Sequence, residues 1–409
     1  MGFIREGFFE EEYSILGLRI PKRLLVPFLI LLGAKVAGAL LSYSLLNIGS
    51  SGTFWMDPIR VFSWDQNRVL LENANGTASW AYTFVGWDSA WYLSIMTRGY
   101  GFSSQSYAFS PILPLLGRGV NLLFKSPVVS IAISSLVFGV LWIPIYQLVA
   151  EMYMSKKAAL ASAFIFALSP YVFLFTTVVY TEGLFLFFTL SSWYLFKKGK
   201  IAFAAGFAAI SALTRIVGVV LAIPMLIVSL RQKGAQRIRW VAFSLLPIVA
   251  LLSWLAYCQL TANDYLALMH ATEWSSLYSL RTLLFEGFPQ NGFSVFQDAF
   301  QNSPTQPVWL APLALLAALV ISPILIYKTI KTEKPLALYS LVCFVWILMV
   351  GALVSMPRYV AVLFPLWIQL TAKLPMNKKS AVILGAVLVV SFITSLSLWV
   401  DFLNGQFVA

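Results

Sequence analysis

Long apolar runs that recur along the chain constrain this sequence more than any other feature. A helix needs roughly 20 mostly apolar residues to cross a bilayer. The clearest runs begin near Leu24, Pro127, Ala158, Trp240, Val308, Leu336 and Ala381. Only 11% of the residues carry a charge, whereas soluble domains average about 25%. The sequence therefore predicts an all-α protein that crosses a membrane many times.

Four shorter apolar runs must also be assigned a position relative to the membrane. They cover residues 182–196, 201–213, 216–230 and 359–372. Each is bounded by charge or proline rather than by a long connection. We interpret them as short or kinked crossings.

The positive charges indicate how the chain is oriented. A net charge of +12 would suggest a polyanion partner such as nucleic acid in a soluble protein. Here 19 basic residues lie in the short connections, and cytoplasmic connections of membrane proteins accumulate Lys and Arg. They are Arg5, Arg19, Lys22, Arg23, Lys156, Lys157, Lys197, Lys198, Lys200, Arg231, Lys233, Arg237, Arg239, Lys328, Lys331, Lys334, Lys373, Lys378 and Lys379. The excess is therefore an orientation signal, and no nucleic-acid partner is predicted.

One path places all of these residues on the cytoplasmic side. It has about eleven crossings, with the N-terminus inside, the first apolar segment retained and the C-terminus outside. It requires residues 201–230 to make two short passes with Arg215 at the outer turn. It also requires residues 109–125 to lie along the outer surface rather than to cross.

The same path leaves two long outer segments, residues 48–125 and 261–307. The first contains Asn75-Gly76-Thr77, an N-glycosylation acceptor pattern. We divide the chain into a transmembrane module over residues 1–260 and a C-terminal part over residues 261–409.

The first outer segment contains a helical pattern with a carboxylate. Trp87, Trp91 and Ile95 recur at helical spacing and predict a face that lies in the membrane interface, with Asp88 and Tyr92 on the neighbouring stripe. A carboxylate held there can take a proton from an acceptor hydroxyl. The alternative is that Asp88 only caps a helix N-terminus.

A second candidate is Tyr180-Thr181-Glu182, between two apolar segments on the predicted outer side. An ionisable group at membrane depth is a functional hypothesis by default. The alternative is that Glu182 is stabilised only by the free N–H groups and dipole of the helix that it begins.

Two arginines interrupt apolar sequence at predicted outer turns, Arg215 and Arg358. Guanidinium binds phosphate in a bidentate manner, so both residues suit a lipid phosphate. The alternative is that their long side chains snorkel to the headgroups. Lys35 lies midway along the first span, and we expect it to pair with an acidic group.

The remaining reactive residue types indicate no cofactor. His270 lacks partners at metal-ligand spacing, and Cys258 and Cys343 lie inside apolar runs as packing residues. No glycine motif that cradles phosphate is present. We predict neither a metal nor a nucleotide.

Several of these motifs together resemble one known family. The motifs are Trp87-Asp88-Ser89-Ala90-Trp91-Tyr92, Arg98-Gly99-Tyr100, Phe109-Ser110-Pro111-Ile112-Leu113-Pro114-Leu115, Ser169-Pro170, Tyr180-Thr181-Glu182-Gly183-Leu184-Phe185 and Thr214-Arg215-Ile216-Val217-Gly218. In this order the chain resembles the PIG-V family, the second mannosyltransferase of glycosylphosphatidylinositol assembly, over about residues 80–220. It departs from the family at Thr97-Arg98 and at Ile216-Val217, which leaves the acceptor open.

The resemblance implies a GT-C glycosyltransferase fold whose first outer loop carries the catalytic Asp. It implies an inverting mannosyltransferase in which Asp88 is the general base and polyprenyl (dolichyl) phosphate mannose is the donor. We infer in addition that Arg215 and Arg358 bind the donor phosphate and that Glu182 orients the acceptor or the sugar. The residues expected to bind substrate are Trp87, Trp91, Tyr92 and Tyr180.

The expected partners are therefore membrane lipid, the lipid-linked donor and a lipid or glycan acceptor, and the active site would face the outer or lumenal side. Two alternatives remain open. One is a multi-pass transporter or lipid flippase, and the other is a GT-C enzyme that transfers a different sugar. We expect the cell membrane of a prokaryote, or the endoplasmic reticulum membrane of a eukaryote.

Overall fold

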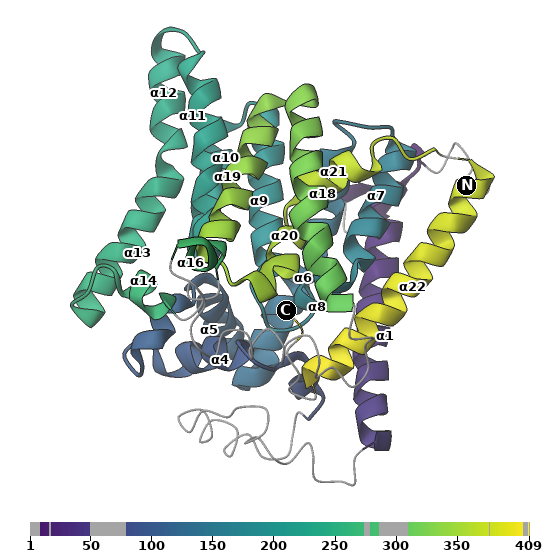
Figure 1. The fold of residues 1–409 in the computed structure, drawn as a ribbon, viewed down its shortest axis with the longest axis horizontal. Coiled ribbons are helices and arrows are strands. Elements are labelled where there is room, and N and C mark those ends of the chain that lie inside the picture. Colours follow the sequence, from purple (N-terminus) through teal and green to yellow (C-terminus); the bar gives the residue numbers. More distant parts are fainter. Residues whose placement is uncertain are drawn as a thin grey trace.

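The computed structural model describes residues 9–15, 18–49, 79–273, 279–285, 310–375, 377–403 and 408. These residues are helical almost throughout (Figure 1). A short antiparallel pair, β1 (Glu12–Ile15) and β2 (Leu18–Pro21), precedes the first helix. The all-α prediction is confirmed. The Asn75-Gly76-Thr77 pattern and much of the segment 261–307 lie outside the described residues.

Five helical spans are long and apolar enough to cross a membrane within the described ranges. They are formed by α1 (Lys22–Gly49), α6 (Pro127–Ala150), α12 (Gly234–Ser244) continued by α13 (Leu246–Ala262), α18 (Leu310–Thr332) and α22 (Lys378–Leu403). Their length and composition are those of an integral membrane protein.

Shorter helices fill the centre of the bundle. They are α7 (Lys156–Leu168), α8 (Pro170–Phe175), α9 (Glu182–Lys197), α10 (Ile201–Thr214), η5 (Ile216–Leu221), α11 (Ala222–Leu230), α19 (Lys334–Val350), η6 (Leu353–Ser355), α20 (Met356–Ala361) and α21 (Phe364–Thr371). The chain reverses between α10 and η5, at Arg215, and returns as α11 (Figure 1). Residues 201–230 therefore form two short helical segments that reverse at Arg215, as predicted, and their crossing of the membrane stays a prediction.

The described part of the segment between α1 and α6, residues 79–126, forms four short helices near one end of the bundle (Figure 1). They are η3 (Ser79–Phe84), α4 (Ser89–Arg98), η4 (Ser104–Ala108) and α5 (Ile112–Phe124). With 13 residues, α5 is about 20 Å long, which is too short to cross a hydrocarbon core of about 30 Å. Its placement along the membrane surface stays a prediction. Two further short helices, α14 (Ala267–Ala271) and α16 (Leu280–Phe285), follow α13.

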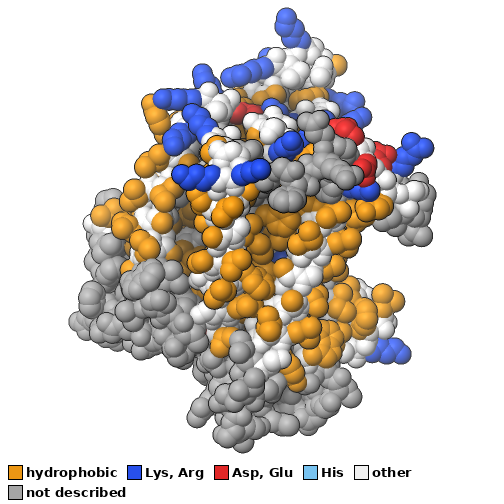
Figure 2. Space-filling view, turned by 90° about the vertical axis from the view of Figure 1, so that its right-hand side faces the viewer, with side chains coloured by type: hydrophobic (Ala, Val, Ile, Leu, Met, Phe, Trp, Pro, Cys, Tyr) orange, Lys and Arg blue, Asp and Glu red, His pale blue; other side chains and the backbone are white. Residues whose placement is uncertain are grey.

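The basic clusters share the opposite end of the bundle. Figure 2 shows Lys and Arg gathered above a broad apolar band. In Figure 1 the turn between α11 and α12 lies at this edge, and ion pairs join basic residues of separate connections, Lys156 to Glu10 and Lys197 to Glu333. The clusters therefore lie on one side, as the sequence predicts, and the compartment that this side faces stays a prediction.

Two glycines bring backbone segments into direct contact at the centre of the fold. A Cβ atom on Gly139 of α6 would lie 1.8 Å from the carbonyl oxygen of Thr176. A Cβ atom on Gly183 of α9 would lie 2.7 Å from the Cα atom of Gly139. Because both positions are glycine, α6 and α9 can pack directly against each other and against the irregular chain between α8 and α9. That irregular chain leads into Glu182.

Candidate functional site

Four charged residues from four separate segments of the chain converge in the interior. Arg215 Nη1 lies 2.6 Å from Glu182 Oε1, and Arg358 Nε lies 2.7 Å from the same oxygen. Arg358 Nη1 lies 3.6 Å from Asp88 Oδ2. Each residue was a separate candidate from the sequence, and the structure places all four in one cluster.

Glu182 is the centre of this cluster. Its side chain is 1% exposed, and both arginines share its Oε1 atom. Its Oε2 atom is buried and has no hydrogen-bond partner among the described residues. Glu182 also begins α9, so the helix dipole favours its charge. The dipole alternative is therefore only part of the explanation, because two cations compensate the carboxylate directly.

Aromatic rings support both guanidinium groups. The Arg358 guanidinium lies 4.5 Å from the ring centres of Phe175 and Tyr180. The Arg215 guanidinium lies 5.3 Å from the ring of Tyr359. Cation–π contacts of this kind stabilise a desolvated charge. The Arg358 side chain is 9% exposed, so the snorkelling alternative is wrong for this residue.

Two of these rings, Phe175 and Tyr359, were not among the candidates from the sequence. Tyr359 directly follows Arg358, which was the available signal. Phe175 lies in an apolar run whose sequence does not distinguish it from its neighbours.

Asp88 lies at the edge of the cluster. It precedes α4, but its side chain makes no capping hydrogen bond, so the capping alternative is wrong. Its backbone N–H donates to the Tyr180 hydroxyl at 3.1 Å, while its side chain is 33% exposed. Burial raises the pKa of the Asp88 carboxyl above its ordinary value, and the charge of Arg358 opposes this rise. Asp88 is thus a carboxylate that other molecules can reach beside two cations.

The turn before α4 corrects one prediction. Trp87 has a φ of +50°, a left-handed conformation that is uncommon outside glycine. The helix therefore begins after Trp87, and the expected face of Trp87, Trp91 and Ile95 does not form. Trp87 is 40% exposed, whereas Ile95 is 2% exposed and packs in the core.

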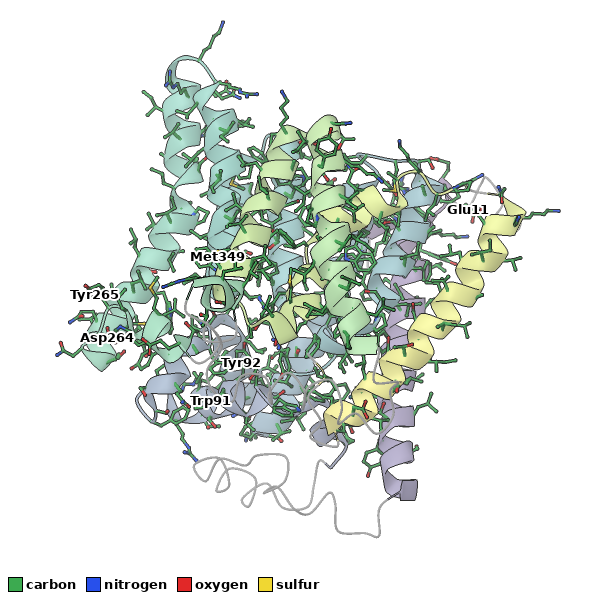
Figure 3. All side chains as sticks on the ribbon, in the orientation of Figure 1. Glu11, Trp91, Tyr92, Asp264, Tyr265 and Met349 are labelled. Atoms are coloured by element: carbon green, nitrogen blue, oxygen red, sulfur yellow. The ribbon has the colours of Figure 1, made fainter. Side chains whose placement is uncertain are left out.

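The other predicted aromatic residues lie in or beside this region. Tyr92 is buried and contacts Phe109 edge-on, with ring centres 5.3 Å apart. Trp91 stacks on the same Phe109 ring at 5.3 Å. Burial raises the pKa of the Tyr92 hydroxyl, so it stays protonated. Figure 3 shows Trp91 and Tyr92 on α4, at the end of the bundle opposite the basic clusters.

The expectation that Lys35 pairs with an acid is wrong. Its Nζ atom donates to the Phe173 carbonyl oxygen at 3.3 Å and to the hydroxyls of Thr176 and Thr177 at 2.7 Å each. Three donors therefore meet three acceptors. These acceptors lie at the C-terminal end of α8, where the helix dipole favours a cation.

Groups from three other elements form hydrogen bonds with the irregular chain that follows α8. The Val179 N–H donates to the Phe84 carbonyl oxygen at 2.8 Å. Ser135 Oγ donates to the Val178 carbonyl oxygen at 2.6 Å, and Ser89 Oγ donates to the Val179 carbonyl oxygen at 3.0 Å. Ser89 is adjacent to Asp88, so these bonds connect the position of Asp88 to that of Tyr180 and Glu182.

The other titratable candidates lie elsewhere. His270 Nδ1 lies 2.7 Å from Asp264 Oδ2 on the α14 segment, and this contact raises the pKa of His270. Both cysteines are buried. Over the described part of the chain, no three His, Cys, Asp or Glu residues are placed to hold a metal ion.

No protein-family model matches the chain, and neither does any curated protein. Among solved structures, a crystal structure of the Archaeoglobus fulgidus oligosaccharyltransferase, in complex with Zn and sulfate, is similar over 91% of this chain. The TM-score is 0.44 and the identity is 15%. The match covers 53% of that protein, so this chain spans about half of its length. A likeness of this degree assigns no family.

Proposed function

We propose that this protein is an integral membrane glycosyltransferase of the GT-C type. It transfers mannose from a polyprenyl-phosphate donor to a lipid-linked or glycan acceptor on the outer or lumenal face. The observation that carries the proposal is the cluster itself, in which a reachable carboxylate lies beside two aromatic-supported guanidinium groups. The motif order that resembles the PIG-V family supports the choice of mannose and of this donor.

Asp88 is the general base of the proposed reaction. Its carboxylate takes the proton of the acceptor hydroxyl while that oxygen attacks C1 of the β-linked mannosyl phosphate. The bond from C1 to the phosphate oxygen breaks, and polyprenyl phosphate leaves. The new bond forms on the opposite face of C1, so the product is an α-mannoside. The raised pKa of Asp88 favours this role, since a base more basic than an ordinary Asp accepts a proton more readily.

Arg215 and Arg358 bind the departing phosphate. A guanidinium has five N–H donors, and the hydrogen bonds to Glu182 occupy one donor on each arginine. The remaining donors suit phosphate oxygens, on which negative charge grows as the bond breaks. Glu182 holds both arginines through Oε1, and its unpartnered Oε2 suits a hydroxyl of the sugar or acceptor.

Transfer of a different sugar by the same machinery is the nearest alternative. The broken helices around the cluster are the observation that favours a transporter or flippase, since transporters bind substrate at such breaks. Here, however, the chain reverses direction at Arg215 instead of continuing across the membrane. This arrangement favours the enzyme.

The test is transfer from radiolabelled polyprenyl-phosphate mannose by purified protein, with extracted lipids and glycans as acceptors. We expect Asp88→Asn to lower kcat by about 100- to 10,000-fold. The matched control is Asp264→Asn, which removes a carboxylate from another outer segment and leaves transfer unchanged. Undiminished transfer by Asp88→Asn would refute the mechanism, and uptake into vesicles without a new glycosidic bond would favour the transporter.

A further inference from the structure

An apolar cavity of about 370 Å³ lies beside the charged cluster. Its walls come from α8, α18, α20, α21 and α22. This volume falls within the range of small-molecule sites, about 300–1,000 Å³. The cavity is separate from the four charged residues, because none of them lines it.

Three of the polar side chains that line the cavity donate to backbone carbonyl oxygens. Ser169 Oγ donates to the Phe166 carbonyl oxygen at 2.8 Å. Thr394 Oγ1 donates to the Val390 carbonyl oxygen at 3.0 Å, and Trp367 Nε1 donates to the Ala361 carbonyl oxygen at 2.7 Å. A polar ligand would find few free partners on these groups, so the lining suits a hydrocarbon.

The longest wall of the cavity is one face of α18. Ala314, Ala317, Ala318, Ile321 and Leu325 line it at helical spacing. These residues extend over about 16 Å of the helix axis. Small residues dominate the part nearer the start of α18. The lining therefore extends along the axis of α18, as the site of a chain molecule requires.

The helix α20 separates this cavity from the charged cluster. Pro357, Val360 and Ala361 face the cavity. Arg358 lies on the adjacent face of the same helix and donates to Glu182. Among the described elements, only α20 lies between Arg358 and the cavity. A lipid whose phosphate is bound to Arg358 can therefore reach the cavity with its hydrocarbon chain.

We infer that this cavity holds the first part of the polyprenyl chain of the donor. The inference rests on the proposed function for the identity of that lipid. The occupant follows from two observations together: a mostly apolar lining that extends along α18, and guanidinium donors for phosphate on the adjacent face of α20. A bulk phospholipid also has a chain and a phosphate, and the experiment separates the two lipids.

The test uses polyprenyl phosphate with a photoreactive diazirine on its chain, bound to the purified protein, with labelled peptides mapped by mass spectrometry. We expect labelling on α18 and α22 that excess unmodified polyprenyl phosphate displaces and excess phosphatidylglycerol does not. Ala317→Trp fills the cavity and should reduce labelling about tenfold. Leu316→Trp is the matched control, because Leu316 is 57% exposed on the same helix, and it should leave labelling unchanged.

Kinetics supply a second readout. Ala317→Trp should raise KM about tenfold for a long-chain donor and leave KM for a short-chain analogue unchanged. Equal effects on both donors, labelling on other helices, or equal displacement by phosphatidylglycerol would overturn the inference. The labelling result does not depend on catalysis. Displaceable labelling of the cavity without any sugar transfer would therefore keep the lipid site and refute the proposed function.

Discussion

At the scale of single residues, the cluster depends on Glu182. Its one oxygen atom Oε1 accepts from both arginines, so its loss leaves two cations without their main partner. Removing one partner of a buried ion pair costs about 3–5 kcal/mol. We expect Glu182→Gln to lower the free energy of unfolding by about that amount, measured by thermal unfolding in detergent.

The control for this substitution is Glu10→Gln. Glu10 pairs with Lys156 at 2.6 Å, but both side chains are exposed, and exposed pairs contribute little. We expect no measurable change in unfolding. Equal shifts for the two variants would contradict the central position of Glu182.

The pH dependence of transfer tests the link between Arg358 and Asp88. Burial raises the pKa of Asp88 and the Arg358 charge lowers it. A base works only when deprotonated, so transfer falls as the pH drops through this pKa. The acid limb of kcat/KM should therefore lie above the ordinary Asp value of about 3.9.

Arg358→Gln removes the opposing charge, so it should move this limb to higher pH, whereas Arg358→Lys should move it less. Arg239→Gln, at the basic end of the protein, should leave it in place. A limb that stays fixed in Arg358→Gln would show that Asp88 does not set the profile.

Single residues also show the limits of prediction from sequence. Asp88, Glu182, Arg215 and Arg358 could be identified because charge inside apolar sequence is costly and therefore conspicuous. Their pairing could not be, since Glu182 and Arg358 are 176 residues apart. The partners of Lys35 were missed because hydroxyls and a carbonyl oxygen, rather than an acid, satisfy its donors.

At the scale of elements, α6 contacts the chain before α9 so closely that Gly139 has no room for a side chain. Gly139→Ala would place its Cβ atom 1.8 Å from the Thr176 carbonyl oxygen, so the two segments must separate. We expect a loss of stability of at least about 1–3 kcal/mol together with a loss of transfer. Gly206→Ala in α10 is the control, because nothing lies within 4 Å of its added Cβ atom. A normal melting temperature for Gly139→Ala would argue against this close approach.

Lys35 has a comparable effect on the chain after α8. Lys35→Met keeps the length of the side chain but removes all three hydrogen bonds, each of which contributes about 1 kcal/mol. We expect the free energy of unfolding to fall by about 1–3 kcal/mol. The chain that positions Tyr180 and Glu182 should also exchange its amide hydrogens faster, measured by mass spectrometry. Unchanged exchange over residues 176–181 would show that η3, α4 and α6 hold this chain without Lys35.

The elements themselves could be predicted to different degrees. The reversal at Arg215 follows from counting basic residues, because a single pass would put the cluster from Arg231 to Arg239 on the wrong side. The turn at Trp87 could not be predicted, since its left-handed backbone interrupts an otherwise regular helical pattern.

At the scale of the whole molecule, sidedness is directly testable. Cys258 and Cys343 are both buried, so the protein has a low background for thiol labelling. We expect Asn263→Cys to react with a membrane-impermeant maleimide on intact cells. Ala235→Cys, in the first turn of α12 beside the basic cluster, should react only after permeabilisation. The reverse pattern would invert the predicted orientation and place the cluster toward the cytoplasm.

The shared oxygen of Glu182 also bears on the order in which the protein is made. Arg215 follows Glu182 by 33 residues, and Arg358 follows it by 176. The ribosome therefore delivers one cation soon after the acid and the other only when most of the chain has been synthesised. A nascent chain that reaches α13 can already neutralise Glu182 through Arg215. Arg358 then binds to an ion pair that has already formed. Glu182 therefore does not remain an unpaired charge in the membrane until the last helices are made.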